Sequence, residues 1–311
     1  MNKSDLEKIV AISETGSMAK AAKKLFITQP ALSKCLTRVE VELGETLFTR
    51  RPNGLIITFA GKCFIKSAYQ ILKLYDNVNI EFCDLNQMRK GVLKLGAVER
   101  VGSLVLPNLL KKFKELYPNI TIDIMEAPSH LLEEKLLMGI IDIAIVCMPL
   151  KNDNINYRIF HEEPFYIALP YNHPLNKKAK KVKGEKIPYL DLQELRGTNL
   201  ILTANLKKTR QGADRILKYL DNDYNVSMEF KNIETVIRLV ANGLGISIIP
   251  SVYSKVYKTG KYIKYYQIDK KYNPTWQWAV IYNEGLGHLT RPSKELLNII
   301  IKNGFILPDY L

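Results

Sequence analysis

A chain of 311 residues is long enough to bury more than one hydrophobic core, and its length predicts two or three domains. No apolar run approaches the length of a membrane-spanning helix, so the sequence excludes an integral α-helical membrane protein. The net charge of +14 favours an anionic partner such as nucleic acid.

The chain begins with MNKSDLEKIV, which is charged and is followed by no apolar signal-peptide core. We therefore expect no signal peptide, no membrane partner and a cytoplasmic protein. Residues 5–14 place Leu6, Ile9 and Val10 on one side of a short helix that ends at Gly16. This apolar side is expected to pack against the helix pair that follows.

Residues 17–43 predict two helices joined by a tight turn at residues 26–27. Ser17 can cap the first helix and Thr28 the second. Pro30 is tolerated in the first turn of the second helix, because amide groups there have no intrahelical partner.

The second helix of this pair has two different faces. Spacings of four, three and four predict its buried face, at Leu32, Leu36, Val39 and Leu43. The opposite face carries hydrogen-bonding and cationic side chains, at Gln29, Ser33, Lys34, Thr37 and Arg38. A helix-turn-helix needs this division to place its second helix in the major groove of DNA. A helical pair within an ordinary all-α core is the alternative interpretation.

Pro52-Asn53-Gly54 lies between two short apolar runs, which predicts a β-hairpin because Asn and Gly tolerate a positive φ. A hairpin at this position is a wing beside the helix-turn-helix. It carries Arg50 and Arg51, for which contact with phosphate or the minor groove is the favoured interpretation. Ordinary surface charge is the alternative.

A long helix is predicted from Thr58, its cap, to about Gln87. Its apolar residues repeat at alternating spacings of four and three, as in a coiled-coil seam, at Phe64, Ala68, Ile71, Tyr75, Val78, Phe82 and Leu85. One helix cannot shield this seam from water by itself. The seam therefore predicts a covering helix, from the same chain or from a second copy.

The segment TQPALSKCLTRVEVELGETLFTRRPNGLIITFAGK resembles the winged helix-turn-helix signature of the LysR-type transcriptional regulators, and the match covers about the first 65 residues. The rest of the chain resembles the effector domain of that family more loosely, through LPNLLKKFKELYPNI, GIIDIAIV, NHPL and LVANGLGISIIP. The resemblance implies that the long helix pairs with its copy in a homodimer, or in a homotetramer that is a dimer of dimers. Such a dimer would present two recognition helices to a two-fold operator.

The helix pair, the wing and this resemblance together predict a DNA-binding transcriptional regulator. Its predicted contacts with double-stranded DNA are Thr28, Gln29, Pro30, Ser33, Lys34, Arg38, Arg50 and Arg51. RNA polymerase is a further candidate partner. The sign of regulation depends on where the operator lies relative to the promoter, which is outside the protein.

From Gly91 onwards, short β-rich runs alternate with helical stretches, which predicts α/β layers around mostly parallel strands. The resemblance implies two subdomains, as in type 2 periplasmic solute-binding proteins, with an effector in the cleft between them. The expected organisation is a winged helix-turn-helix domain at 1–58, a linker and dimerisation helix at 59–88, and an effector-binding domain at 89–311. Within the last, subdomain I comprises 91–162 and 269–311, and subdomain II comprises 163–268.

Ligands of such sheets bind beyond the carboxyl ends of strands, near helix N-termini. The expected effector contacts there are Glu99, Arg100, Ser103, Ser129, Cys147 and Thr203. Ser129 and Thr203 match positions that the family uses, whereas Arg100 stands where the family commonly has a small hydroxyl residue. Arg100 could bind a carboxylate effector through two hydrogen bonds, or it could pair with Glu99 or the cleft walls and partly close the site. Ser129 could also be a plain helix cap.

Most of the positive charge lies outside the predicted DNA-binding domain, because residues 1–60 have a net charge of only +3. Residues 177–186 hold six Lys and one Glu, and residues 255–271 hold six Lys and one Asp. The favoured interpretation is solvated faces of a lysine-rich protein, and a second nucleic-acid site is the alternative.

The four cysteines and four histidines show no spacing typical of metal ligands, so we expect reduced thiols, no structural metal and no cofactor. No motif of a hydrolase, metalloprotease or nucleotide-binding enzyme is present, which indicates a protein that is not an enzyme. The main alternative function is an intracellular solute-binding protein whose N-terminal domain only dimerises.

Overall fold

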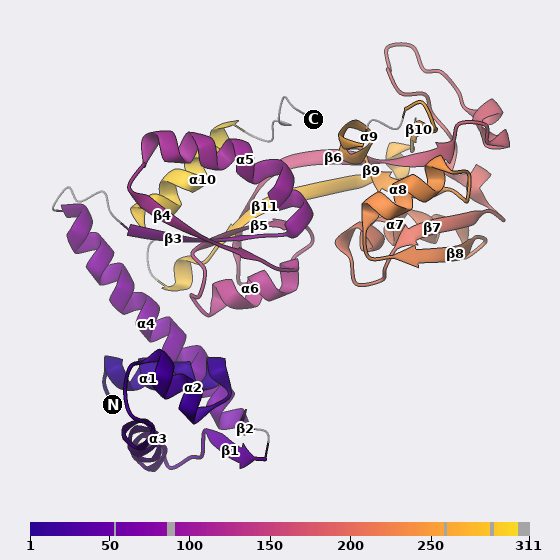
Figure 1. The fold of residues 1–311 in the computed structure, drawn as a ribbon. Coiled ribbons are helices and arrows are strands. Elements are labelled where there is room, and N and C mark those ends of the chain that lie inside the picture. Colours follow the sequence, from indigo (N-terminus) through magenta and orange to yellow (C-terminus); the bar gives the residue numbers. More distant parts are fainter. Residues whose placement is uncertain (53, 86–90, 258–259, 287–288, 304–311) are drawn as a thin grey trace. The chain divides into compact units, whose positions relative to one another are not determined.

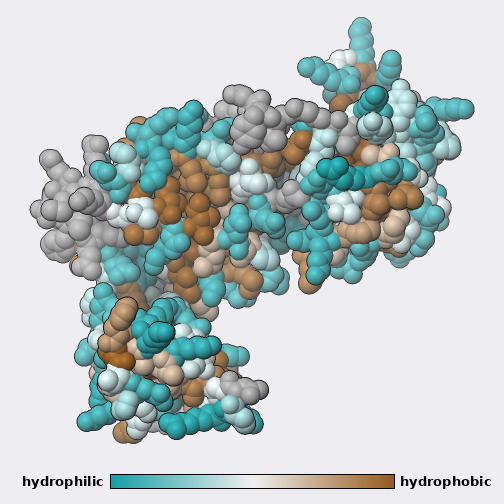
Figure 2. All heavy atoms as spheres, in the orientation of Figure 1, coloured by the Kyte–Doolittle hydropathy of each residue, from teal (hydrophilic) through white to brown (hydrophobic). Residues whose placement is uncertain are grey.

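The computed structural model describes residues 1–52, 54–85, 91–257, 260–286 and 289–303, with the backbone alone at 79–85, 100, 286 and 303 (Figure 1). These residues form two compact units. Unit 1 comprises 1–146, 150–158 and 280–302, and unit 2 comprises 147–149 and 159–279. Hydrophilic side chains cover much of the face drawn in Figure 2. Among the described residues, no helix has both the length and the apolar character that a membrane span requires.

Unit 1 begins with the predicted helices: α1 (Lys3–Thr15), α2 (Met18–Lys24) and α3 (Gln29–Leu43). Side chains of the predicted cap residues accept backbone hydrogen bonds at the start of two of them, Ser17 from Lys20 and Thr28 from Ala31. Gly16 ends α1 at φ 60° and Gly44 ends α3 at φ 71°, both in the left-handed region that favours glycine. Local sequence therefore determines where these helices start and stop.

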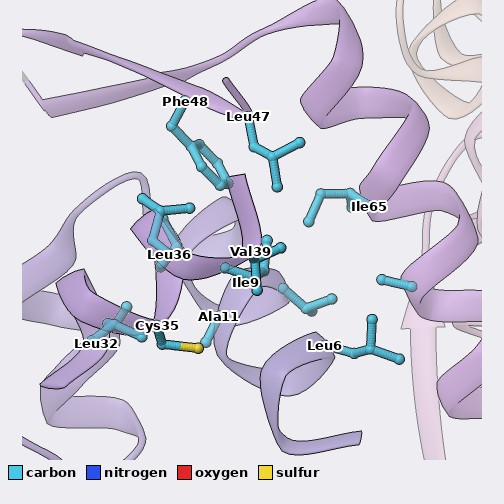
Figure 3. Packing of buried hydrophobic residues seen from close by; sticks show 14 of the residues in the cluster. Leu6, Ile9, Ala11, Leu32, Cys35, Leu36, Val39, Leu47, Phe48 and Ile65 are labelled. Atoms are coloured by element: carbon cyan, nitrogen blue, oxygen red, sulfur yellow. The ribbon is translucent and has the colours of Figure 1, made fainter. Parts of the chain in front are cut away.

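The N-terminal core joins the inner faces of these helices (Figure 3). Leu6 and Ile9 of α1 meet Leu32 and Val39 of α3, and all four are at most 3% exposed. The prediction was wrong for Leu43, which is 43% exposed and lies outside this cluster. Leu43 is the last residue of α3, so no following turn of helix covers it.

The predicted wing is an antiparallel hairpin of β1 (Phe48–Arg51) and β2 (Gly54–Ile57), in which Arg51 pairs with Gly54. Asn53, predicted as part of its turn, lies outside the described residues. Leu55 donates a backbone hydrogen bond of 2.9 Å to the carbonyl of Gly16. A Cβ on Gly54 would lie 2.7 Å from the same carbonyl oxygen, so glycine is required for the wing to reach the turn between α1 and α2.

Helix α4 (Phe59–Leu85) is the predicted long helix, and Thr58 caps it by accepting a 2.9 Å hydrogen bond from the amide of Gly61. Its first turns belong to the N-terminal core through Ile65 and Ala68, which are 7% and 0% exposed. A hydrogen bond of 2.7 Å from the Tyr69 hydroxyl to Glu14 continues this contact onto α1.

The middle of α4 forms hydrogen bonds and an ion pair with the α/β part of unit 1. The Gln70 side-chain amide donates to the carbonyl of Leu137 at 3.0 Å. Lys73 forms an ion pair with Asp142, and these side chains are only 13% and 4% exposed. Asp142 also accepts a 2.8 Å hydrogen bond from the amide of Lys94. We call this group of contacts the α4 clasp.

The sheet of unit 1 is built from β3 (Gly91–Ala97), β4 (Ile120–Glu126), β5 (Ile143–Cys147) and the end of β11 (Thr275–Tyr282), in the order β11-β5-β3-β4. Strand β3 pairs in parallel with both β4 and β5, as the alternating pattern predicted. Figure 1 shows α5 (Glu99–Leu116) and α10 (Arg291–Asn303) on one face of the sheet and α6 (Ser129–Leu137) on the other.

Unit 2 is organised around β6 (Asn156–Pro170), with β9 (Ser247–Pro250) and β10 (Ile263–Gln267) antiparallel to it. A separate parallel pair is formed by β7 (Asn199–Thr203) and β8 (Asn225–Phe230). The α-helices in the described part of unit 2 are α7 (Lys208–Leu217), α8 (Ile233–Ala241) and α9 (Val252–Val256). The residues of β6 and of β11 are divided between the two units, so the chain passes from one unit to the other along each of them. The predicted fold class, a winged helix-turn-helix followed by an α/β domain of two parts, is confirmed.

Candidate nucleic-acid interface and effector-contacting groups

The outer face of α3 carries the predicted DNA-contacting side chains. Gln29, Pro30 and Lys34 are exposed and Ser33 is half-buried, whereas Leu32 beside them is fully buried. Within the described part of the chain, no carboxylate lies within 4.0 Å of the Lys34 ammonium group. The face therefore offers an amide, a hydroxyl and an unpaired cation, which suit the edges of bases and the phosphates beside them.

Arg38 has a role within the fold that the sequence did not reveal. Its guanidinium group forms an ion pair with Asp5, a carboxylate only 3% exposed on α1, while Arg38 itself is half exposed. Burial would raise the pKa of Asp5, but hydrogen bonds from Asn2, Cys35 and Arg38 outweigh burial and lower it. Arg38 therefore holds α3 on α1.

Arg50 and Arg51 are both exposed on β1, and neither has a carboxylate within 4.0 Å among the residues that the structure describes. Because successive side chains of a strand point to opposite faces, the two arginines extend to opposite sides of the wing. They therefore cannot approach one DNA groove in the same way.

The turn between α2 and α3 contains a phenylalanine with an unfavourable backbone conformation and an exposed ring. Phe26 has φ 54°, in the left-handed region, and is 96% exposed. Both properties are unfavourable for an aromatic residue, since a Cβ strains this conformation and the ring stays in water. The sequence placed Phe26 in the turn but gave no indication of the strain.

Replacing Phe26 with asparagine is expected to stabilise unit 1 by about 1 kcal/mol, because asparagine adopts the left-handed conformation more readily. Thermal unfolding of both proteins measures the difference. Phe26→Ala is the matched control, since alanine removes the ring but retains the strain. Equal midpoints for the asparagine and alanine variants would contradict the prediction.

The predicted dimerisation seam on α4 is only partly available. Ala68 is fully buried in the N-terminal core and Phe64 packs against the same core, so the structure removes both from the seam. From Ile71 onwards the described part of the seam is open to solvent, with exposed fractions of 37% at Ile71, 48% at Tyr75 and 50% at Val78. The side chains of Phe82 and Leu85 lie outside the described residues.

Two helices begin at one edge of the sheet in unit 1. Strands β3 and β4 are parallel neighbours that end at Ala97 and Glu126, which pair with each other. Helices α5 and α6 begin two and three residues later, and their N-cap residues, Val98 and Pro128, provide no side-chain hydrogen bond. Their first amide groups therefore lack the usual cap, and such groups attract anions.

The predicted effector contacts of unit 1 lie at this edge. Glu99 is the first residue of α5, Ser103 lies one turn further on with an exposed side chain, and the side chain of Arg100 lies outside the described residues. Ser129 is the first residue of α6, and the cap position belongs to Pro128, so the cap role for Ser129 was wrong. The Ser129 side chain is buried, at 4% exposure, and its hydroxyl has no hydrogen-bond partner among the described residues. A buried hydroxyl of this kind is unfavourable unless a ligand or water satisfies it.

The other two predicted contacts belong to unit 2. Thr203 ends β7 and is 5% exposed, and its hydroxyl lies 2.8 Å from that of Thr209. Cys147 is 2% exposed, and burial raises the pKa of its thiol to about 12. At neutral pH Cys147 is therefore a neutral, apolar group with no thiolate character.

We expect thiol reagents at about pH 8 to modify Cys63 and to leave Cys147 unmodified in the folded protein, because Cys63 is exposed whereas burial shields the Cys147 thiol and disfavours its thiolate. Mass spectrometry of peptides after labelling, with and without denaturant, measures both sites. Rapid labelling of Cys147 in the folded protein would contradict its burial.

Among the described residues, no group of three or more His, Cys, Asp or Glu side chains is arranged to hold a metal ion. Two candidate sites therefore come from the described residues: the outer face of α3 with the wing, and the helix N-termini beside Ser129.

Family models match both the helix-turn-helix and the α/β part of the chain. The family described as "Bacterial regulatory helix-turn-helix protein, lysR family" matches residues 4–62, and "LysR substrate binding domain" matches residues 86–299. The chain is 31% identical over 251 residues to the uncharacterized HTH-type transcriptional regulator YbhD of Escherichia coli, covering 80% of this chain and 76% of YbhD. It is 30% identical over 248 residues to the HTH-type transcriptional activator CmpR of Synechocystis sp., covering 80% and 78%.

Solved structures show the same fold at lower sequence identity. A full-length OxyR variant from Pseudomonas aeruginosa superposes with a TM-score of 0.71 at 24% identity, over 97% of this chain and 94% of OxyR. Full-length CbnR, solved in complex with its target DNA, gives a TM-score of 0.64 at 20% identity, over 97% and 99%. The matches span the helix-turn-helix and the α/β domain, and the chain therefore belongs to the LysR family of bacterial DNA-binding transcriptional regulators.

Proposed function

We propose that this regulator is controlled by a small molecule with hydrogen-bond acceptors, a carboxylate above all, that binds its C-terminal domain. The observation that carries this proposal is the buried, unpartnered Ser129 hydroxyl beside two helix N-termini without side-chain caps. A carboxylate would accept hydrogen bonds from these donors and from a guanidinium group. The proposed effector contacts are Glu99, Arg100, Ser103, Ser129, Cys147 and Thr203.

A relative supports a small-molecule ligand. The regulatory domain of CcmR from Synechocystis was solved in complex with 2-PG, and it superposes on 68% of this chain with a TM-score of 0.58 at 20% identity. Many family members have a small hydroxyl residue at the position of Arg100. We propose that Arg100 gives this chain a different ligand preference from theirs.

For DNA binding, the proposed contacts are Thr28, Gln29, Pro30, Ser33, Lys34, Arg38, Arg50 and Arg51. We further propose that a second copy covers the open seam from Ile71 to Val78, so that a homodimer, or a tetramer of two such dimers, reads a two-fold operator. The proposed domains are 1–58, 59–88 and 89–311. A solute-binding protein that uses its N-terminal domain only to dimerise is not favoured, because the outer face of α3 is polar and bears an unpaired lysine.

Fluorescence anisotropy of the full chain tests the proposal. It compares the DNA upstream of its own gene with a scrambled duplex, at two salt concentrations and with a panel of small carboxylates. We expect a preference for the upstream DNA that persists at the higher salt concentration and that one acid changes. Equal binding to both duplexes that disappears at higher salt would contradict sequence-specific regulation at this site.

The ligand part of the proposal has its own control. Ser129→Ala is expected to remove the response to the acid and to leave DNA affinity without ligand unchanged. A full response in the Ser129→Ala protein would exclude the Ser129 site as the place of binding.

A further inference from the structure

Two lysine-rich segments of unit 2, far apart in the sequence, lie against each other. Residues 177–186 belong to the loop after β6, and residues 255–271 include β10, which pairs antiparallel with β6. Tyr171 donates a backbone hydrogen bond of 2.8 Å to the carbonyl of Tyr262. The Lys264 ammonium group lies 4.4 Å from the centre of the Tyr171 ring.

The far end of the loop returns to the same strand. Gln267 donates its amide to the carbonyl of Pro188 at 2.9 Å, and its side chain donates to Glu185 at 2.9 Å. Lys180 and Tyr189 pair across the loop, and Tyr189 also pairs with Gln267. The two lysine clusters therefore lie on neighbouring segments of unit 2, and we call the exposed lysines of these segments the basic surface. Figure 2 shows mostly hydrophilic side chains on the loop that projects after β6.

The basic surface holds most of the excess charge of the protein. Each of its two segments has a net charge of +5, so together they account for ten of the fourteen net positive charges, against +3 for residues 1–60. Within the described residues, only Lys178 and Lys271 among these lysines have a carboxylate within 4.0 Å. The exposed lysines without such a partner are Lys177, Lys180, Lys181, Lys183, Lys186, Lys255, Lys261 and Lys270. So many exposed lysines on neighbouring segments create a positive potential that attracts polyanions.

We propose that the basic surface binds the phosphate backbone of double-stranded DNA, independently of sequence, while the helix-turn-helix holds its operator. This goes beyond the proposed function and rests on the chain being bound to DNA. The cations of the surface are all lysines, which act as point charges on flexible stems and suit contacts that need no fixed geometry. Tethering to a DNA-bound domain also presents DNA to the surface at a high effective concentration, which no other polyanion shares.

The experiment uses the full chain and a variant with Lys180→Gln, Lys181→Gln, Lys183→Gln and Lys186→Gln. The matched control carries Lys151→Gln, Lys207→Gln, Lys231→Gln and Lys294→Gln, which are exposed lysines outside the surface. Both variants lose four charges. Each protein is titrated with a long duplex from upstream of its own gene and with a scrambled duplex of the same length, over a range of salt concentrations.

We expect the surface variant to bind both long duplexes about 10-fold or more weakly than the control variant, with a salt slope smaller by about 2 to 4, since each phosphate contact contributes about 0.9. Equal affinities and slopes for the two variants would overturn the proposal. A different result would refute the proposed function, namely that the unaltered protein shows no preference for upstream DNA over scrambled DNA. In that case the affinities of the two variants for scrambled DNA still test whether the basic surface binds DNA.

Binding to vesicles of phosphatidylglycerol and phosphatidylcholine, measured by sedimentation, separates DNA from an anionic membrane. We expect no difference between the two variants in this assay. Vesicle binding that only the surface variant loses, with unchanged DNA binding, would assign the basic surface to a lipid surface and refute the DNA assignment.

Discussion

Replacing Asp142 with alanine is expected to reduce the stability of unit 1 by about 3 to 5 kcal/mol, the range for breaking one partner out of a buried ion pair. The Lys73 side chain is only 13% exposed, and the variant removes the carboxylate that pairs with it. The variant also removes the acceptor of the Lys94 amide. Chemical denaturation followed by circular dichroism measures the loss.

Two further variants separate charge from shape at the α4 clasp. Asp142→Asn retains an acceptor for the Lys94 amide, so it should lose less stability than the alanine variant. The double variant Lys73→Met with Asp142→Leu removes both charges and should recover most of the stability, because an apolar pair of similar volume replaces a buried ion pair at little cost. A double variant as unstable as Asp142→Ala would show that the ion pair is not the cause.

Operator affinity is expected to fall by about 100-fold or more in Ser33→Arg, while the thermal unfolding midpoint stays unchanged. Ser33 is half-buried, between the buried Leu32 and the exposed Lys34. An arginine side chain at this position would extend into the space that the edges of bases would occupy. Anisotropy with upstream and scrambled DNA measures the effect. Unchanged affinity would contradict the assignment of this face to DNA.

Arg50→Ala is the variant to compare with Ser33→Arg, because we expect the wing to contact the phosphate backbone of DNA and not its bases. Its affinity should fall to a similar extent on every sequence, with a salt slope smaller by about 1. A loss confined to the upstream DNA would instead assign Arg50 to base reading.

The N-terminal elements were predictable because their signals are local. A cap at Thr28, a glycine at Gly44 and an apolar spacing along α3 act within a few residues of one another, and the structure contains all three. The errors arose where tertiary packing decides. The spacing of α4 left open whether the same chain or a second copy covers its seam, and the family resemblance favoured a second copy, but the N-terminal core of the same chain buries Ala68.

The effector-contacting groups were less predictable, because their environment depends on pairing between distant segments. Only the parallel register of β3 with β4 brings the starts of α5 and α6 to one edge and leaves the Ser129 hydroxyl buried without a cap role. The ion pair of Lys73 with Asp142 joins residues 69 positions apart, and no spacing rule connects them. The convergence of the two lysine clusters likewise follows from the pairing of β10 with β6.

The division of α4 between two packing surfaces limits how such regulators can recombine. An exchange of coding sequence just before α4 would separate Ile65 and Ala68 from the core they fill, and an exchange just after α4 would separate Lys73 from Asp142. A hybrid joined at either boundary keeps both surfaces matched only where the two parents carry compatible residues at the positions that it separates. A functional chimaera of this protein with a relative that is joined after α4 should therefore carry residue 142 from the same parent as residue 73.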